Sequence, residues 1–99
     1  TGMGSNIAYC ASKAAVDNLT KSFARAFAPI RVLSLSPGLV NNEFIPNISD
    51  AWKNEQASKI ALSRLTTAEE VALSAMSIVN HLTYSTGCVI SVDGGRQLN

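Results

Sequence analysis

Residues 30–38 read IRVLSLSPG, and this stretch decides the fold class. It is short and mostly apolar, and the Pro37-Gly38 pair marks its end. A continuous apolar run bounded by turn residues is typical of a strand that is buried on both faces of a parallel sheet. We therefore predict a buried strand over residues 30–36, with a turn at its carboxyl end.

A long helix is expected before this strand, over about residues 7–28. Ser5 or Asn6 can cap it, and Pro29 ends it because proline disfavours helical geometry at Ala28. Small side chains on one face of this helix would allow another helix to approach closely. The apolar residues at helical spacing are Ala11, Ala14, Ala15, Leu19, Phe23 and Ala26.

Two further helices are expected after the strand. Residues 39–48 have the character of a loop, and Ser49 can cap a helix over about residues 50–61. The segment TTAEE at residues 66–70 contains two overlapping capping boxes, one from each threonine. The helix that follows these boxes is predicted to end near His81.

A second strand is predicted over residues 88–92, followed by a turn at residues 93–95. A strand, a helical crossover and another strand imply a parallel pair with a right-handed connection. The predicted fold class is α/β, the back half of a doubly wound parallel sheet (Rossmann-type), with the order helix-strand-helix-helix-strand. The strand at 30–36 needs neighbours on both edges, so we expect another segment or another subunit beside it.

The composition fits a globular domain and argues against several classes of function. The chain has 99 residues, 46% of them hydrophobic, with a formal net charge of +1 and scattered basic residues. No basic patch indicates nucleic acid, and no apolar run approaches the ~18 residues of a membrane helix or forms a signal peptide. Cys10 and Cys88 indicate reduced core residues rather than a disulfide or a metal site. We therefore expect a cytoplasmic protein without a metal ion.

Tyr9 and Lys13 lie four residues apart near the start of the first predicted helix. Residues at this spacing share a helix face. A positive charge beside a phenol favours the phenolate, which improves the phenol as a proton donor and acceptor near neutral pH. The pair is therefore a candidate for general acid–base chemistry. The competing interpretation is an ordinary surface pair, because many helices show this spacing by chance.

Four segments, taken together and in this order, resemble the short-chain dehydrogenase/reductase family. They are YCASKAA at 9–15, IRV at 30–32, SPGLV at 36–40 and GCVISVDGG at 87–95. Arg64 followed by TAEEVA at 67–72 is also similar to the family's segment before its last helix. The resemblance covers essentially the whole chain, and it is closest to the type that includes 3-oxoacyl carrier-protein reductases.

The resemblance implies an oxidoreductase that uses NAD or NADP and transfers a hydride between the nicotinamide and a carbonyl or alcohol substrate. Tyr9 would be the catalytic acid–base group, and Lys13 would assist it and bind the nicotinamide ribose. The cofactor-binding residues implied by the family are Tyr9, Lys13, Pro37, Gly38, Val40 and Asn42. Asn42 stands where the family often has Thr, and it can also donate and accept hydrogen bonds.

The resemblance also implies a substrate lid and a subunit interface. Phe44, Ile45, Ile48 and Trp52 fall in the lid segment, although Trp52 is equally suited to a core or a subunit contact. The family commonly forms dimers and tetramers through its Tyr-bearing helix and its last strand and helix, so a homo-oligomer is expected. The expected partner is a small-molecule carbonyl or alcohol compound, with no nucleic acid or membrane.

Family members are more than twice as long as this chain. By resemblance, residues 1–99 are the carboxyl-terminal part of a single domain whose amino-terminal half carries the Gly-rich phosphate-binding turn and the active-site Ser. A second interpretation is therefore a non-catalytic fragment or oligomerisation piece, with the isolated 99 residues inactive. A third is a family member that binds a ligand without chemistry. The substrate and the choice between NAD and NADP stay open.

Overall fold

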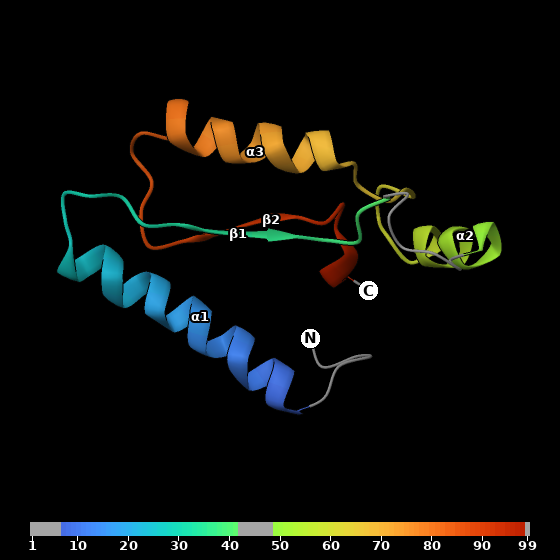
Figure 1. Ribbon diagram of the computed structural model, residues 1–99, viewed down its shortest axis with the longest axis horizontal. Coiled ribbons are helices and arrows are strands. Elements are labelled where there is room, and N and C mark those ends of the chain that lie inside the picture. The colour runs from blue at the N-terminus through green and yellow to red at the C-terminus, as the bar shows by residue number, and fades with distance from the viewer. Residues whose placement is uncertain (1–6, 42–48, 99) are drawn as a thin grey trace. The chain divides into compact units, whose positions relative to one another are not determined.

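The computed structural model describes residues 7–41 and 49–98 (Figure 1). The elements follow in the order α1 (Ile7–Ala26), β1 (Ser34–Pro37), α2 (Asp50–Ser58), α3 (Ala68–Asn80), β2 (Val89–Val92) and a short 3-10 helix, η1 (Arg96–Leu98). The two strands pair in one sheet. This arrangement confirms the predicted α/β class and the order helix-strand-helix-helix-strand.

The pairing of β1 and β2 is parallel. The backbone N–H of Ser34 donates to the carbonyl oxygen of Cys88 at 3.1 Å, and the N–H of Gly38 donates to that of Val92 at 2.9 Å. Both bonds join residues separated by the same interval along the chain, and only parallel strands keep that interval constant. The predicted parallel pair is therefore present.

The chain divides into two compact units, and the division falls within both strands. The first unit takes its described residues from Thr1–Leu35 and Tyr84–Ile90. The second takes them from Ser36–Thr83 and Ser91–Asn99. Each unit is described by itself below.

In the first unit, α1 is packed through a face that the apolar periodicity does not identify. Thr20 and Ala24 are its buried residues, with relative exposures of 5% and 6%. The six residues of the predicted apolar face are all exposed, among them Leu19 and Phe23. The helix also ends at Ala26, two residues before the predicted end.

The strand predicted over residues 30–36 is regular only from Ser34 to Pro37. Before that point Val32 is held differently, because its N–H donates to the side-chain oxygen of Thr86 at 3.0 Å. The carbonyl oxygen of Val32 accepts from the N–H of Gly87 at 2.7 Å. A side chain therefore replaces one backbone partner here, which delays the start of the regular ladder.

In the second unit, side-chain caps begin both helices. The N–H of Trp52 donates to the hydroxyl of Ser49 at 3.1 Å, as predicted for the start of α2. At the start of α3, Thr67 and Glu70 form a complete capping box, and the helix ends at Asn80 with His81 as its C-cap. The second predicted box, from Thr66, is absent because the backbone of Thr66 pairs with that of Val40 in a parallel bridge.

The described residues bury little apolar surface. Ala24 and Ile60 are the buried apolar residues among them. Three apolar residues on α3 are solvent-exposed, with relative exposures of 62% for Leu73, 59% for Met76 and 68% for Val79. Exposed apolar side chains gathered on one element are typical of a surface that another protein segment covers.

Candidate active site

Tyr9 and Lys13 lie in the first three turns of α1, as predicted. The Tyr9 side chain is 55% exposed, and Lys13 is exposed as well. An α-helix turns by about 100° per residue, so Tyr9, Lys13, Thr20 and Ala24 all fall within an arc of about 60°. The candidate catalytic pair therefore shares a helix face with the two residues of α1 that are buried within the first unit.

That face is the side of α1 that meets the start of β1. The hydroxyl of Thr20 is hydrogen-bonded to the hydroxyl of Ser34, which is the first residue of β1. Ala24 lies close to Gly87, where an added Cβ would come 3.4 Å from the Ala24 Cβ. Tyr9 and Lys13 thus lie on the same side of the helix as Thr20, about three turns and about two turns before it.

The second group of candidate residues, Pro37, Gly38 and Val40, belongs to the second unit. The segment is held on both sides by backbone hydrogen bonds. Gly38 N–H donates to the Val92 carbonyl at 2.9 Å, and the carbonyl of Leu39 accepts from the N–H of Thr66 at 3.1 Å. Pro37 is exposed and Val40 is half-buried. The backbone that follows β1 is therefore hydrogen-bonded to two neighbouring segments of the second unit.

Gly38 is required by a close approach within the protein itself. A Cβ added there would come 2.8 Å from the Asp93 Cα and 2.9 Å from the Asp93 Cβ. Contacts this short force the backbone to move, because the obstructing atoms belong to the turn that follows β2. The predicted role of Gly38 beside a nicotinamide stays a prediction, and the packing against Asp93 already accounts for the glycine.

Of the remaining predicted residues, the structure describes only Trp52. Asn42, Phe44, Ile45 and Ile48 lie outside the described residues. Trp52 lies in α2 and is 39% exposed. The structure therefore places Tyr9 and Lys13 on one face of α1 in the first unit. The second unit contains the hydrogen-bonded segment with Pro37, Gly38 and Val40.

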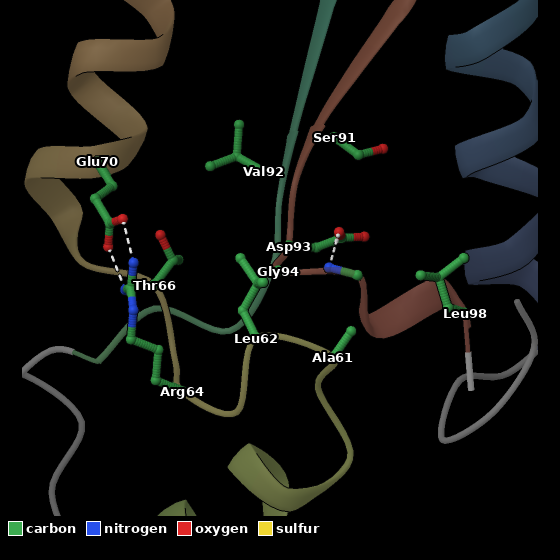
Figure 2. A pocket seen from close by; sticks show the side chains of 11 residues that line it. Ala61, Leu62, Arg64, Thr66, Glu70, Ser91, Val92, Asp93, Gly94 and Leu98 are labelled. Atoms are coloured by element: carbon green, nitrogen blue, oxygen red, sulfur yellow. Dashed lines mark hydrogen bonds and ion pairs between the residues drawn. The ribbon is translucent and has the colours of Figure 1, made fainter.

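A cavity of about 440 Å³ lies within the second unit (Figure 2). Figure 2 shows Arg64 and Glu70 pointing toward one another at one wall, and Leu62 and Ala61 along the floor. The other lining residues are Thr66, Ser91, Val92, Asp93, Gly94, Gly95 and Leu98. The cavity is bounded by α3, the end of β2 and the turn after it.

Two of the three charged side chains that line this cavity, Arg64 and Glu70, form an ion pair, and Asp93 is the third. The two guanidinium nitrogens Nη1 and Nη2 of Arg64 each donate to one carboxylate oxygen of Glu70, both at 2.7 Å. The Arg64 hydrogen bond, followed by one from the backbone N–H of Thr67, lowers the pKa of Glu70 to about 2. Glu70 is therefore ionised at neutral pH and unsuited to proton exchange there.

The sequence analysis names Arg64 and a capping box that includes Glu70, but it does not predict an ion pair between the two residues. The available signal was an Arg three residues before a helix N-cap whose capping box supplies a Glu. A capping glutamate is already fixed by the backbone, so an arginine just ahead of the helix can reach it at little entropic cost.

No group of three or more His, Cys, Asp or Glu side chains gathers among residues 7–41 and 49–98. Within the same residues no helix has the length and apolar character needed to cross a membrane. Neither Cys10 nor Cys88 takes part in a disulfide.

A family model described as enoyl-(acyl carrier protein) reductase matches residues 1–97. The chain is 38% identical to dihydromonapterin reductase from Enterobacter sp. (strain 638), over 99% of this chain and 40% of that protein. It is 36% identical to a 3-oxoacyl-[acyl-carrier-protein] reductase from Chlamydia muridarum, over 88% of this chain and 36% of that protein. The chain thus spans about 40% of the length of the first of these relatives and slightly less of the second.

Solved structures show the same likeness. A short-chain dehydrogenase/reductase from Burkholderia xenovorans superposes with a TM-score of 0.83 at 37% identity, covering 100% of this chain and 38% of that one. A small-chain dehydrogenase in complex with NADPH superposes with a TM-score of 0.75 at 33% identity, covering 87% of this chain and 41% of that one.

Proposed function

The chain belongs to the short-chain dehydrogenase/reductase family, and from this premise we propose that the full-length protein is an NAD(P)-dependent oxidoreductase. Its reaction would interconvert a carbonyl compound and the corresponding alcohol. The relatives named above are reductases, and one similar structure was solved with NADPH. The observation that carries the proposal is the exposed Tyr9–Lys13 pair on the sheet side of α1.

Tyr9 is proposed as the group that exchanges a proton with the substrate oxygen. During reduction it would donate the phenolic proton to the carbonyl oxygen, and during oxidation it would remove the hydroxyl proton. Lys13 lies one helical turn away, where a positive charge favours the phenolate that remains after donation. Both side chains are exposed on that face of the helix, which supports the proposal.

The cofactor is proposed to be NAD or NADP, which supplies the hydride. The exposed side chains of Lys13 and Tyr9 suit it, because an ammonium and a phenol can both hydrogen-bond to sugar hydroxyls. Lys13 and Tyr9 would hold the nicotinamide ribose. Pro37, Gly38 and Val40 would line the nicotinamide from the held segment after β1, and Asn42, which lies outside the described residues, would extend that wall.

The proposed substrate class is a small molecule with a carbonyl or an alcohol. The two named relatives are reductases of quite different compounds, a pterin and an acyl chain on a carrier protein. Their difference limits the proposal to the reacting group. A lid that includes Phe44, Ile45, Ile48 and Trp52 would exclude water from the reaction.

The full-length protein is also proposed to be a cytoplasmic homo-oligomer, a dimer or a tetramer. The apolar side chains exposed on α3, at Leu73, Met76 and Val79, support an interface there. Apolar residues exposed on α1, such as Leu19 and Phe23, support a second contact face. The absence of a disulfide between Cys10 and Cys88 fits a reducing compartment.

A second candidate is that the 99 residues act as a non-catalytic piece. The small buried core among the described residues indicates that the chain packs against other segments, which fits this candidate and a longer catalytic domain equally. We propose that the chain acts within a longer domain, whose amino-terminal half supplies the phosphate-binding turn, and that the isolated 99 residues are inactive.

The experiment compares the full-length protein with its Tyr9→Phe variant. Binding of NADH and NADPH is followed by fluorescence, and turnover is followed with a panel of carbonyl compounds. We expect the variant to bind the cofactor within about threefold of the wild type and to lose turnover by about 10³-fold, because the proton donor is gone. Turnover by Tyr9→Phe near the wild-type rate would refute the role of Tyr9. Failure of the wild type to bind either cofactor would favour the non-catalytic alternative.

A further inference from the structure

Thr20 is a buried polar residue in the carboxyl-terminal half of α1, the helix that carries the proposed catalytic pair. Its relative exposure is 5%, and it is the buried polar residue among the described ones. Its hydroxyl donates to the carbonyl oxygen of Val16 at 2.8 Å, one turn earlier in α1. The same hydroxyl is hydrogen-bonded to the hydroxyl of Ser34. A threonine hydroxyl has a single proton, so Ser34 is the donor in the bond between them.

Ser34 is itself fixed in the sheet. It is the first residue of β1, and its backbone N–H donates to the carbonyl oxygen of Cys88 at 3.1 Å. The chain of hydrogen bonds therefore runs from the sheet backbone, through two hydroxyls, to the backbone of α1. It is a directional connection between the helix and the strand within the first unit.

A second contact on this helix face works differently. Ala24 lies against Gly87, whose backbone has a φ of +74° and whose added Cβ would come 3.4 Å from the Ala24 Cβ. Small apolar groups in contact fix how closely the helix approaches, but they allow it to rotate about its axis. A hydrogen bond weakens steeply when its geometry changes, so the Thr20–Ser34 bond resists that rotation.

Rotation of α1 matters because Tyr9 and Lys13 lie on the same face as Thr20. Eleven residues separate Tyr9 from Thr20, which places the phenol about 16 Å along the axis and about 20° around it. Side-chain atoms lie about 5–6 Å from the axis of a helix, so a rotation of about 10° moves them by about 1 Å. A misplacement of about 1 Å can lower a rate by about 100-fold.

We propose that Thr20 is a positioning residue, and that its hydrogen bond to Ser34 sets the rotation of α1 and thereby aims Tyr9 and Lys13 at the substrate. The inference rests on the proposed function of these two residues. It explains why a polar residue occupies the buried face of the helix, where an apolar side chain would pack as well.

The variants Thr20→Val, Thr20→Ser and Ser34→Ala test the inference in the full-length protein. Valine keeps the shape of threonine and removes the hydroxyl, serine keeps the hydroxyl, and Ser34→Ala removes the donor alone. Ser74→Ala is the matched control, because Ser74 makes the same kind of bond to the carbonyl oxygen of Glu70 at 2.8 Å, on α3. All rates are measured well below the melting temperature of each variant.

We expect Thr20→Val and Ser34→Ala each to lower kcat by at least about 10-fold. The double variant should be no slower than the single ones, because both remove the same bond. Thr20→Ser and Ser74→Ala should stay within about twofold of the wild type. The pH dependence of kcat should not change, since a rigid rotation moves Tyr9 and Lys13 together.

Two results would overturn the inference. One is an unchanged kcat in folded Thr20→Val and Ser34→Ala. The other is a crystal structure of Thr20→Val in which the Tyr9 hydroxyl stays within about 0.5 Å of its wild-type position, the tolerance expected of a working site. The crystal structure tests the positioning without reference to activity. The Tyr9→Phe assay fails separately if the proposed function is wrong, so the two failures are distinguishable.

Discussion

The helices α1 and α3 are held in opposite ways. α1 is fixed in its carboxyl-terminal half, by the buried and uncharged contacts of Thr20 and Ala24, whereas Tyr9 and Lys13 near its start are exposed. α3 is fixed at its very start, by an exposed capping box and the Arg64–Glu70 ion pair. The first turn of α3 carries structural contacts. The proposed catalytic residues Tyr9 and Lys13 are exposed in the first two turns of α1, at the opposite end of that helix from its buried contacts.

Replacing a glycine by alanine in each unit should have the largest effect on the free energy of unfolding, and the effect should differ between the two units. Gly94, in the second unit, has a φ of +64°, and its added Cβ would come 2.7 Å from Cγ2 of buried Ile60. Gly94→Ala should lower the free energy of unfolding by about 3 kcal/mol, because strain and overpacking add. Gly87→Ala, beside α1, should cost about 1 kcal/mol, mostly from strain. Urea unfolding of both variants checks the order, and equal costs would contradict it.

The start of α3 offers a smaller and more local effect. Thr67→Ala removes the hydroxyl that accepts from the N–H of Glu70 at 3.1 Å. The loss should be about 1 kcal/mol of unfolding free energy, as for other N-caps. Thr66→Ala is the control, since the side chain of Thr66 makes only a 3.5 Å contact to the Thr67 carbonyl. It should cost less than about 0.5 kcal/mol. Thermal or urea unfolding with equal losses for both would mean that the capping box contributes nothing of its own.

The Arg64–Glu70 ion pair at the start of α3 should make the free energy of unfolding depend on pH in the acidic range. The uncharged contacts of α1 should add no such dependence. The folded pKa of Glu70 is about 2, below its ordinary value of 4.5. A lowered folded pKa stabilises the protein above pH 4.5, and this contribution is lost as the pH falls from 4.5 toward 2. The stability difference between wild type and Glu70→Gln should therefore shrink over that window.

The measurement is the urea midpoint of both proteins at several pH values. Glu69→Gln is the matched control, because Glu69 has the same charge in the same turn but is not the residue paired with Arg64. The pair is exposed, so a modest effect is expected. A difference between wild type and Glu70→Gln that stays constant from pH 5 to pH 2 would contradict the assigned cause.

The sequence was sufficient for the order of elements, the parallel pairing, the caps of α2 and α3, and the end of α3. Each of these depends on local chemistry: a hydroxyl before a helix, a Pro-Gly pair after a strand, or an apolar run. The buried face of α1 was not predictable in this way. Apolar periodicity selects Leu19 and Phe23, whereas the packed residue is Thr20, whose partner Ser34 is distant in the sequence.

The same limit applies to the candidate site. The Tyr9–Lys13 pair was predictable because both residues lie on one helix, where spacing fixes their relation. The Arg64–Glu70 pair and the contact of Gly38 with Asp93 depend on how separate segments meet. Capping of α3 by Thr66 was predicted and is wrong, since the backbone of Thr66 is paired with Val40. The local capping motif of Thr66 and Glu69 is present in the sequence, but the backbone pairing of Thr66 with a distant residue prevents it from forming.

The central claim is that the exposed end of α1 meets a nicotinamide cofactor. The most direct test is a crystal structure of the full-length protein with NADH or NADPH bound. The account predicts that the Lys13 ammonium lies within about 3.2 Å of a ribose hydroxyl of the nicotinamide half, with the Tyr9 hydroxyl facing the same cleft. A cofactor bound elsewhere, or a Tyr9 side chain that points away from the nicotinamide, would contradict it.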